Sequence, residues 1–445
     1  MSYTKWADKE EFKKNLTKIS ELTKIEQGGI PYMYEDKILY IDDSINHTLI
    51  IDSEEKNKNE KAILASMKLS IAAKENIIIT DNNNELYKKL YSSLKSNNYN
   101  IVYLDFTNPL LGNAWNPLTL PYKLYKNNEI DKAINVLEKV GHYLFKDAKR
   151  TGDPFWTNSA SDLFVGIAFY LFSKANEEEI NLQSIFNIVD NSEELINDII
   201  PLFKKILTSL DYSNEAYINL SSILKAPTET RGGIFAVFKQ QIRLYLSRES
   251  LANQLSYTNF KYETNEKNAI FIISNSYTQK LVPAFIEQVS TLIDSKNKTN
   301  IILNNFTSIF PFENLPILLS NAKYNNIKYI LSVPNYQEIE NIYGKEEANI
   351  IELSCANLIY LITNDPYTLE KISELCGTNK NEPLISVQEL KTIAYDEAIV
   401  LVPRMMPYKT KLIDCDDIDW LENSENYIVS ERELKEIKIY DINKI

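Results

Sequence analysis

The chain has 445 residues, of which 44% are hydrophobic and 24% are charged, a balance typical of a globular protein rather than a disordered one. Its formal net charge of −13 argues against polyanion binding by the chain as a whole, because phosphate binding depends on clustered lysine and arginine. Cys355, Cys376 and Cys415 show no metal-ligand spacing and the two histidines are too few for a histidine-rich site, so we expect no metal and a reducing compartment.

The start of the sequence shows no targeting signal. Met1–Lys24 is charged throughout and lacks the apolar centre of a signal peptide. The longest apolar stretch, Leu163–Phe172, is about half as long as a spanning helix needs to be, so we expect a buried helix there. We therefore expect a cytoplasmic protein without a membrane span.

Short β-rich apolar runs alternate with longer amphipathic segments. Runs such as Ile77–Ile79 and Ile270–Ile273 are apolar at consecutive positions, as in strands that are covered on both faces. The predicted strands are Thr48–Ile51, Asn76–Thr80, Asn100–Phe106, Ala269–Ser274, Asn300–Leu303, Lys328–Val333, Leu358–Thr363 and Ala398–Val402. The predicted helices between them are Glu60–Ala73, Asn84–Ser96, Ser276–Ile293, Glu313–Tyr324 and Pro366–Cys376. This alternation predicts an α/β fold with a doubly wound, mainly parallel sheet.

Helical periodicity replaces the alternation between residues 116 and 257. The helices predicted there are Ile130–Phe145, Asn158–Ala175, Leu182–Val189, Glu193–Leu210 and Glu229–Leu246, with Thr157 or Asn158 as the N-cap of the second. We therefore divide the chain into 1–115 and 258–412 as two parts of a sheet core, 116–257 as an inserted all-α domain, and 413–445 as an acidic, peripheral tail.

The first strand-to-helix turn lies where a sheet of this kind binds phosphate. Measured against the phosphate-loop pattern G-x-x-x-x-G-K-[ST], Lys58 stands at the lysine position. However, Asp52, Glu55 and Asn57 stand where glycine is needed, and a non-glycine residue in a left-handed conformation costs about 1–2 kcal/mol. Asn59 also lacks the hydroxyl that would bind magnesium. Taken alone, the turn is best explained as a charged, solvated connection in which Lys58 is a surface lysine.

The end of a later strand also indicates that the residues needed for nucleotide hydrolysis are missing. An NTPase of this architecture ends a later strand in Asp-Glu, where the aspartate holds hydrated magnesium and the glutamate polarises the attacking water. This chain has Asn304 and Asn305 there, and neither side chain carries charge or takes up a proton. Loss of a general base alone costs about 10²–10⁴-fold in rate. We therefore predict no catalytic residues, no hydrolysis and no bound nucleotide cofactor, although the pair also suits a simple strand-end turn.

Several short motifs, in order, resemble those of the type IV coupling proteins, the TraG/VirD-type ATPases that deliver DNA–relaxase complexes to a conjugative secretion channel. The segments that carry the resemblance are Lys5–Glu11, His47–Ile50, Thr80–Tyr87, Asp105–Phe106, Asn108–Pro109, Trp115–Leu118, Asp153–Trp156, Tyr343–Glu347, Asn364–Pro366 and Ile372–Gly377. The resemblance implies a RecA-like P-loop NTPase-type fold with an inserted all-α domain, and ATP and Mg²⁺ as the cofactors of the family.

The departures from the family pattern fall on its functional positions. Besides the two sites above, Asn82 and Asn83 replace a Pro-Lys pair, and Pro334 stands where the family has a glutamine that senses the γ-phosphate. Arg231 matches a helix-start arginine and is a candidate for action in trans on a neighbouring subunit, with a surface cation as the alternative. The resemblance therefore puts hydrolysis in doubt while it supports the fold.

Three functions remain open. We favour a catalytically inactive paralogue that acts as an adaptor or regulatory subunit, with an active coupling ATPase or other type IV secretion components as partners in a hetero- or homo-oligomer. The second is a module that binds relaxase or single-stranded DNA without ATP, and the third is a divergent, active DNA-translocating ATPase. A genomic neighbour with intact motifs favours the first, a basic concave face the second, and measured turnover the third.

Overall fold

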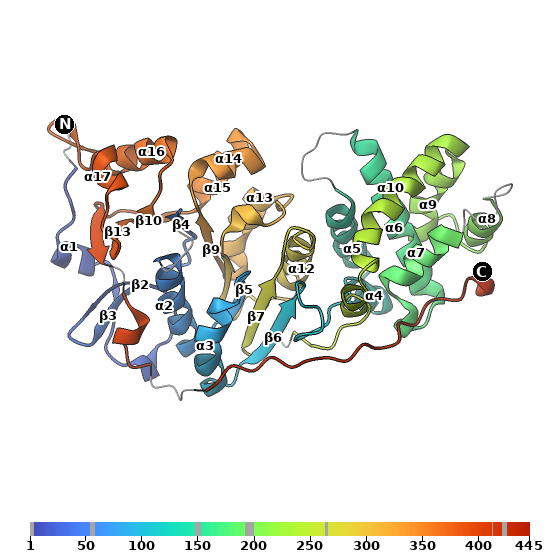
Figure 1. Ribbon diagram of the computed structural model, residues 1–445, viewed down its shortest axis with the longest axis horizontal. Coiled ribbons are helices and arrows are strands. Elements are labelled where there is room, and N and C mark those ends of the chain that lie inside the picture. The colour runs from blue at the N-terminus through green and yellow to red at the C-terminus, as the bar shows by residue number, and fades with distance from the viewer. Residues whose placement is uncertain are drawn as a thin grey trace. The chain divides into compact units, whose positions relative to one another are not determined.

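The computed structural model describes residues 4–53, 58–146, 153–191, 200–262, 266–411, 413–420 and 425–445. The chain forms two compact units, shown in Figure 1. Unit 1 consists of Met1–Val102, Glu263–Ile273 and Ile293–Ile428, and unit 2 of Tyr103–Tyr262, Ser274–Leu292 and Val429–Ile445. Each unit is thus assembled from segments that are far apart in the sequence.

Within the described residues, a nine-stranded sheet has the order β14-β13-β10-β4-β9-β8-β5-β7-β6. The strands are β4 (Thr48–Asp52), β5 (Asn76–Thr80), β6 (Asn100–Asp105), β7 (Asn268–Ile273), β8 (Thr299–Leu303), β9 (Ile327–Val333), β10 (Asn357–Ile362), β13 (Glu397–Leu401) and β14 (Tyr408–Lys411). The pairs from β10 through β7 are parallel, and β13 and β14 add an antiparallel edge. The predicted doubly wound, mainly parallel α/β sheet is confirmed.

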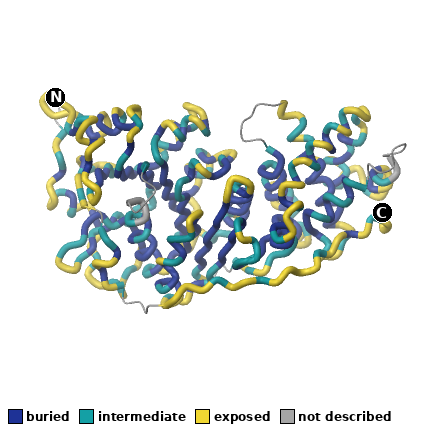
Figure 2. Tube along the Cα trace, in the orientation of Figure 1, coloured by how far each residue is buried: buried dark blue, intermediate teal, exposed yellow. Residues whose placement is uncertain are grey.

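The central strands are covered on both faces. Every residue of β4, β5, β7, β8 and β9 is buried, and Figure 2 shows these strands as continuous dark blue. The helices of unit 1 are α1 (Lys9–Lys13), α2 (Lys58–Ala72), α3 (Glu85–Ser96), α13 (Leu315–Ala322), α14 (Tyr336–Tyr343), α15 (Lys345–Ser354), α16 (Pro366–Cys376) and α17 (Val387–Lys391). Of these, α2 packs on β4 and β5, and α13 and α14 pack on β9. This explains the apolar runs, because a strand with no solvent face needs no polar alternation.

A small antiparallel sheet precedes β4 and was not predicted. It contains β1 (Thr17–Ile19), β2 (Ile30–Glu35) and β3 (Ile38–Asp42) in the order β1-β3-β2. Asp36 and Lys37 join β2 to β3 with φ of 48° and 62°, the two left-handed residues of a tight hairpin turn. On β3, Leu39 and Ile41 are buried together with Leu69 and Ile418. Ile418 lies in the segment expected to be a peripheral tail, so part of that segment belongs to a core cluster.

The helices of unit 2 are α4 (Thr119–Lys126), α5 (Ile130–Phe145), α6 (Pro154–Lys174), α7 (Leu182–Asn191), α8 (Ile200–Thr208), α9 (Glu215–Lys225), α10 (Thr228–Leu246), α11 (Glu249–Gln254) and α12 (Leu281–Ser290). The N-cap predicted for α6 was wrong. The cap is Asp153, whose Oδ1 accepts a 2.9 Å hydrogen bond from the backbone N–H of Phe155, because Pro154 suits the first helical turn. The first part of the predicted helix 193–210 lies outside the described residues.

Helix α12 belongs to unit 2 although it follows β7 in sequence. Its buried Glu287 accepts from the Tyr143 hydroxyl of α5 and pairs with Lys139 at 2.8 Å. The next residue, Gln288, accepts a 3.3 Å hydrogen bond from the indole N–H of Trp115. The helical unit therefore extends beyond 116–257 on both sides. Among the described residues, no helix combines the length and the apolar character needed to cross a membrane.

Candidate functional site

The carboxyl ends of β4, β9, β8 and β5 lie side by side and form the candidate nucleotide site. Ile51 of β4 aligns with Val333 of β9. Leu303 of β8 aligns with Leu331 of β9 on one side and with Thr80 of β5 on the other. Ligands of doubly wound sheets bind at this edge, so the residues that follow these strands would face a nucleotide.

The side chain and backbone of Asn304 are held by both neighbours of β8. Its Oδ1 accepts a 2.9 Å hydrogen bond from Ser332 Oγ on β9, and its N–H donates to Thr80 Oγ1 on β5 at 2.9 Å. Ser332 and Thr80 are 2% and 1% exposed. Asn304 is thus the middle member of a polar bridge across three strands, which we call the strand-end bridge (Thr80, Asn304 and Ser332).

Asn305 makes the turn that leaves β8. Its φ of 50° is left-handed, a region in which asparagine is enriched among non-glycine residues. Its N–H donates to Ser332 Oγ at 2.8 Å, and its carbonyl accepts from Ser308 Oγ at 2.7 Å. These contacts lead into the short 3-10 helix η3 (Phe306–Ser308). The residue type is therefore explained by the turn conformation.

The strand-end bridge does not fit a Mg²⁺–nucleotide complex. Magnesium in such sites is bound by one or two carboxylates together with phosphate oxygens and waters. Asn304 instead offers a neutral carboxamide oxygen that already accepts from Ser332. In the part of the chain that the structure describes, no group of three or more His, Cys, Asp or Glu side chains is placed to hold a metal ion.

The phosphate-loop position is described only in part. Asp52 ends β4 and is 6% exposed, and the next residue, Ser53, donates its N–H to the Ile362 carbonyl of β10 at 3.0 Å. Lys58 and Asn59 begin α2, of which only the backbone is described at these positions, and Glu55 and Asn57 lie outside the described residues. A strand and a helix therefore follow in the order of a phosphate site, and an aspartate ends the strand. Like-charge repulsion between this carboxylate and a phosphate group opposes binding.

The aspartate after β5 has a structural role. Asp81 is fully buried, and its carboxylate accepts from the backbone N–H groups of Tyr87 at 2.8 Å and Leu86 at 3.3 Å. It thereby binds the orphan donors at the start of α3, where negative charge is also favoured by the helix dipole. Asn82 and Asn83, which follow it, are exposed.

Arg231 lies on α10 and is only 8% exposed, which does not match a surface cation. Its Nη1 donates to the Leu224 carbonyl at 3.1 Å, near the end of α9. Carbonyls at a helix C-terminus lack intrahelical partners, and a cation is favoured beside them. The guanidinium group of Arg231 thus stabilises the end of α9.

His47 precedes β4 and is fully buried. Its Nδ1 accepts from the Tyr329 backbone N–H at 3.0 Å, and its Nε2 donates to the Leu319 carbonyl at 2.8 Å. Burial lowers the pKa of this imidazole to about 4. His47 is therefore a neutral structural residue at neutral pH, with both ring nitrogens engaged.

Sequence reasoning located Asn304 and Asn305 at the end of a strand but missed Ser332 and Thr80. One sequence signal could have identified them: each of these residues carries a hydroxyl group at or near the end of an otherwise apolar run. The periodicity of a sequence does not reveal which strands are neighbours, so the bridge itself was not predictable.

We expect Ser332→Ala to lower the free energy of unfolding by about 1–3 kcal/mol, because it removes the hydrogen bonds that the buried Ser332 makes with the half-buried Asn304 and Asn305. Urea denaturation followed by circular dichroism measures the loss. Ser332→Thr keeps the hydroxyl and should lose less, and Ser247→Ala, at an exposed position away from the strand-end bridge, is the matched control. An effect of Ser332→Ala no larger than that of Ser247→Ala would show that the bridge adds no stability.

Comparisons with known proteins identify the family. A family model described as Type IV secretory system Conjugative DNA transfer matches residues 70–382, more than half of the chain. No curated protein matches the sequence.

Solved structures share the fold at low sequence identity. The plasmid coupling protein TrwB, in complex with a non-hydrolysable ATP analogue, is similar at a TM-score of 0.66 and 14% identity, over 92% of this chain and 93% of that one. TrwB in complex with ADP and Mg²⁺ is similar at a TM-score of 0.65 and 12% identity, over 97% and 96% of the two chains. VirB4 of Thermoanaerobacter pseudethanolicus gives 0.57 and 10%, over 87% and 97%. These likenesses confirm the RecA-like P-loop NTPase-type fold, and the family model shows that the chain belongs to the family of type IV secretory system conjugative DNA transfer proteins.

Proposed function

We propose that this member of the conjugative DNA transfer family is a pseudo-ATPase that acts as an adaptor or regulatory subunit of the transfer machinery. The observation that carries the proposal is the strand-end bridge: Asn304 accepts from Ser332 and donates to Thr80 at the position where magnesium and the attacking water would be handled. A neutral amide engaged in this way neither neutralises a metal nor takes up a proton. The fold then serves binding and assembly.

The proposed partners are an active coupling ATPase or other components of a type IV secretion system. A chain that keeps the fold of a nucleotide-binding relative over nine-tenths of its length can keep the subunit faces of that fold as well. The proposed location is the cytoplasm, at the inner face of the plasma membrane through such partners. Assembly with an intact relative gives a hetero-oligomer, and assembly with itself a homo-oligomer.

We expect the purified chain to hydrolyse ATP and GTP no faster than its Lys58→Ala variant. Converting Asp52, Glu55 and Asn57 to glycine should not produce turnover, because Asn304 and Asn305 remain without charge. A phosphate-release assay on the three proteins, with and without Mg²⁺ and single-stranded DNA, measures this. Turnover in the natural chain that disappears in Lys58→Ala would overturn the proposal and support a divergent active ATPase.

Two further measurements separate the parts of the proposal. A calorimetric titration with Mg·ATP should show no micromolar affinity, and such affinity would make the chain a nucleotide-sensing subunit instead. The adaptor role predicts that the chain co-purifies with an intact-motif coupling ATPase of the same host and changes its turnover. Absence of both effects, from a folded chain, would contradict the adaptor role while leaving the lack of catalysis standing.

A further inference from the structure

The last residues of the chain, 430–445, belong to unit 2, and we call them the tail. They are extended as far as Asp441 and end in the short 3-10 helix η6 (Ile442–Lys444). Figure 1 shows the tail as the red segment that ends beside the helices of unit 2, and Figure 2 shows that most of it is exposed. Six residues of unit 2 form what we call the tail groove: Leu110, Gly112, Asn181, Ser184, Asn253 and Tyr257.

The first part of the tail binds by strand addition. The Gly112 N–H donates to the Ser430 carbonyl at 2.7 Å, and the Arg432 N–H donates to the Leu110 carbonyl at 2.7 Å, in antiparallel register. Gly112 has φ of +71°, and a Cβ at this position would lie 2.3 Å from the Tyr103 carbonyl oxygen. Only glycine therefore fits at position 112, where the tail binds. Strand addition of this kind is a recurring way in which proteins bind extended peptides.

The second part of the tail is also bound through its main chain. Asn253 Nδ2 donates to the Lys435 carbonyl at 2.6 Å, and Asn181 Nδ2 donates to the Lys438 carbonyl at 2.8 Å. The Tyr440 N–H then donates to Ser184 Oγ at 3.0 Å. Hydrogen bonds to main-chain atoms do not depend on the side chains of the bound segment, so the groove recognises an extended conformation.

Two side chains supply selectivity. Arg432 donates to the Tyr257 hydroxyl at 2.7 Å and to the Pro109 carbonyl. Eight residues later Tyr440 is 3% exposed and meets the Tyr170 ring edge-on, with the ring centroids 6.3 Å apart. Between these anchors Leu434 and Ile439 are 47% and 46% exposed, so these two side chains add little to the core. This is how a peptide ligand is held, by two anchors and its backbone.

The middle of the tail covers open space. A cavity of about 920 Å³ lies against Lys435–Lys438 and is lined on its other side by residues that include Asn116, Lys123 and Tyr257. This part of the tail is therefore held at a few points and is not packed along its whole length. Release of this middle part opens no apolar core, and Tyr440 is the buried ring that release of the whole tail would expose.

We propose that the tail groove is an exchangeable docking site, which accepts residues 430–445 of a second copy of this chain in place of its own. The same sequence fits the groove whichever copy supplies it, so exchange of an identical element costs little beyond association. The Arg432 and Tyr440 anchors of the incoming tail would occupy the places that the chain's own anchors hold. This surface is separate from the strand-end bridge and does not depend on the loss of catalysis.

The first test is binding in trans. A fluorescent peptide of residues 429–445 is titrated into a variant that ends at Ile428 and into the full chain. We expect saturable binding to the shortened variant and at least 10-fold weaker binding to the full chain, whose groove is filled. A peptide with Tyr440→Ala should bind at least 10-fold more weakly, whereas Leu434→Ala, at an exposed position, should leave binding unchanged.

A full-length double variant guards against misfolding of the shortened chain. Arg432→Ala with Tyr440→Ala loosens the tail without deleting it, and this variant should also bind the natural peptide. If neither variant binds the peptide while both keep the far-ultraviolet spectrum of the natural chain, the tail is a fixed part of the fold and the proposal is overturned.

The second test asks whether a second copy is the occupant. A full chain with Asn181→Ala and Asn253→Ala keeps its tail but has a weakened groove, and the variant ending at Ile428 keeps its groove but has no tail. We expect the two to form a mixed complex in sedimentation velocity at concentrations where neither self-associates. Peptide binding without any mixed complex, at concentrations well above the peptide dissociation constant, would contradict exchange between copies.

Discussion

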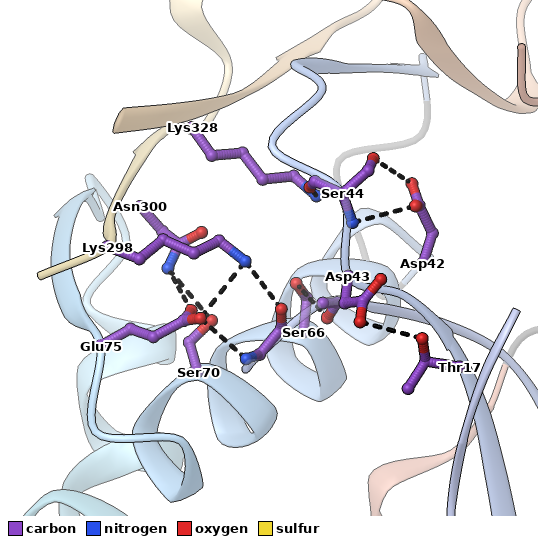
Figure 3. A network of polar contacts seen from close by, with 12 residues as sticks. Thr17, Asp42, Asp43, Ser44, Ser66, Ser70, Glu75, Lys298, Asn300 and Lys328 are labelled. Atoms are coloured by element: carbon purple, nitrogen blue, oxygen red, sulfur yellow. Dashed lines mark hydrogen bonds and ion pairs between the residues drawn. The ribbon is translucent and has the colours of Figure 1, made fainter. Parts of the chain in front are cut away.

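Replacing Glu75 with alanine is expected to lower the free energy of unfolding by about 3–5 kcal/mol, because it leaves a buried cation without its partner. The Glu75 and Lys298 side chains are 5% and 10% exposed, and their charged atoms are 3.2 Å apart. The Glu75 carboxylate also accepts from the Gly28 N–H at 2.7 Å. It accepts from Asn300 Nδ2 at 2.7 Å as well, and Figure 3 shows Glu75 beside Asn300 and Lys298. One carboxylate thus binds three donors from two separate segments of unit 1, the loop before β2 and the start of β8.

The measurement is the urea denaturation midpoint, with the slope of the transition as a check that the unfolded state is unchanged. Glu75→Gln keeps the shape and one acceptor but loses the charge, so we expect an intermediate loss. Glu21→Ala, which removes the exposed pair of Glu21 with Lys24, is the matched control and should change little. A loss below about 1 kcal/mol in Glu75→Ala would show that desolvation of the pair cancels its attraction.

The same network explains a glycine that sequence reasoning passed over. A Cβ on Gly28 would lie 2.7 Å from Glu75 Oε2 and 2.7 Å from the Ser70 Cα, so the loop before β2 can approach α2 only without a side chain. Lys298 also donates to the Gly28 carbonyl at 2.8 Å. The amino ends of the strands are therefore tied by charge, whereas the carboxyl ends are tied by the neutral strand-end bridge.

Much of the sheet was predictable because its strands are short and buried on both faces. The apolar runs Ile77–Ile79 and Ile270–Ile273 predict strands although they show no polar alternation. Both runs lie within strands of the structure, β5 and β7. The hairpin of β2 and β3 was missed because Asp36 and Lys37 make its turn in left-handed conformations without glycine or asparagine. The residue types at these two positions therefore did not indicate a hairpin turn.

The candidate site was predictable in position but not in its contacts. The end of β8 follows from an apolar run, yet the neighbours of β8 are β9 and β5, which are separated from it by different stretches of sequence. For the same reason residues 430–445 were predicted only as part of an acidic, peripheral segment and not as a bound one. Tyr440 is buried by contacts with α6 and α7, more than two hundred residues earlier in the chain.

We finally expect Lys328→Met to raise the free energy of unfolding at pH 7 by about 2 kcal/mol, an advantage that should vanish as the pH rises. Lys328 is 1% exposed on β9, and its Nζ donates to the Ser44 carbonyl at 3.1 Å. Burial lowers the pKa of the ammonium group from 10.5 to about 8, although Asp42, Glu75 and Asp43 oppose the decrease and Lys298 adds to it. This difference in pKa corresponds to about 3 kcal/mol, from which we subtract about 1 kcal/mol for the lost hydrogen bond.

The sign follows from proton linkage. Below pH 8 both the folded and the unfolded chain carry the proton on Lys328, and the full cost of the buried charge is present. Between about pH 8 and 10.5 the folded chain releases the proton while the unfolded chain keeps it, so stability rises with pH relative to a chain without this lysine. Cys355 and Cys376, whose pKa burial raises to about 12, act in the opposite direction but equally in both proteins. The difference between Lys328→Met and the natural chain, from urea denaturation at pH 7, 8, 9 and 10, therefore isolates Lys328. Lys323→Met, at an exposed position, should show no such trend, and a difference for Lys328→Met that stays constant from pH 7 to 10 would show that the buried ammonium keeps its ordinary pKa.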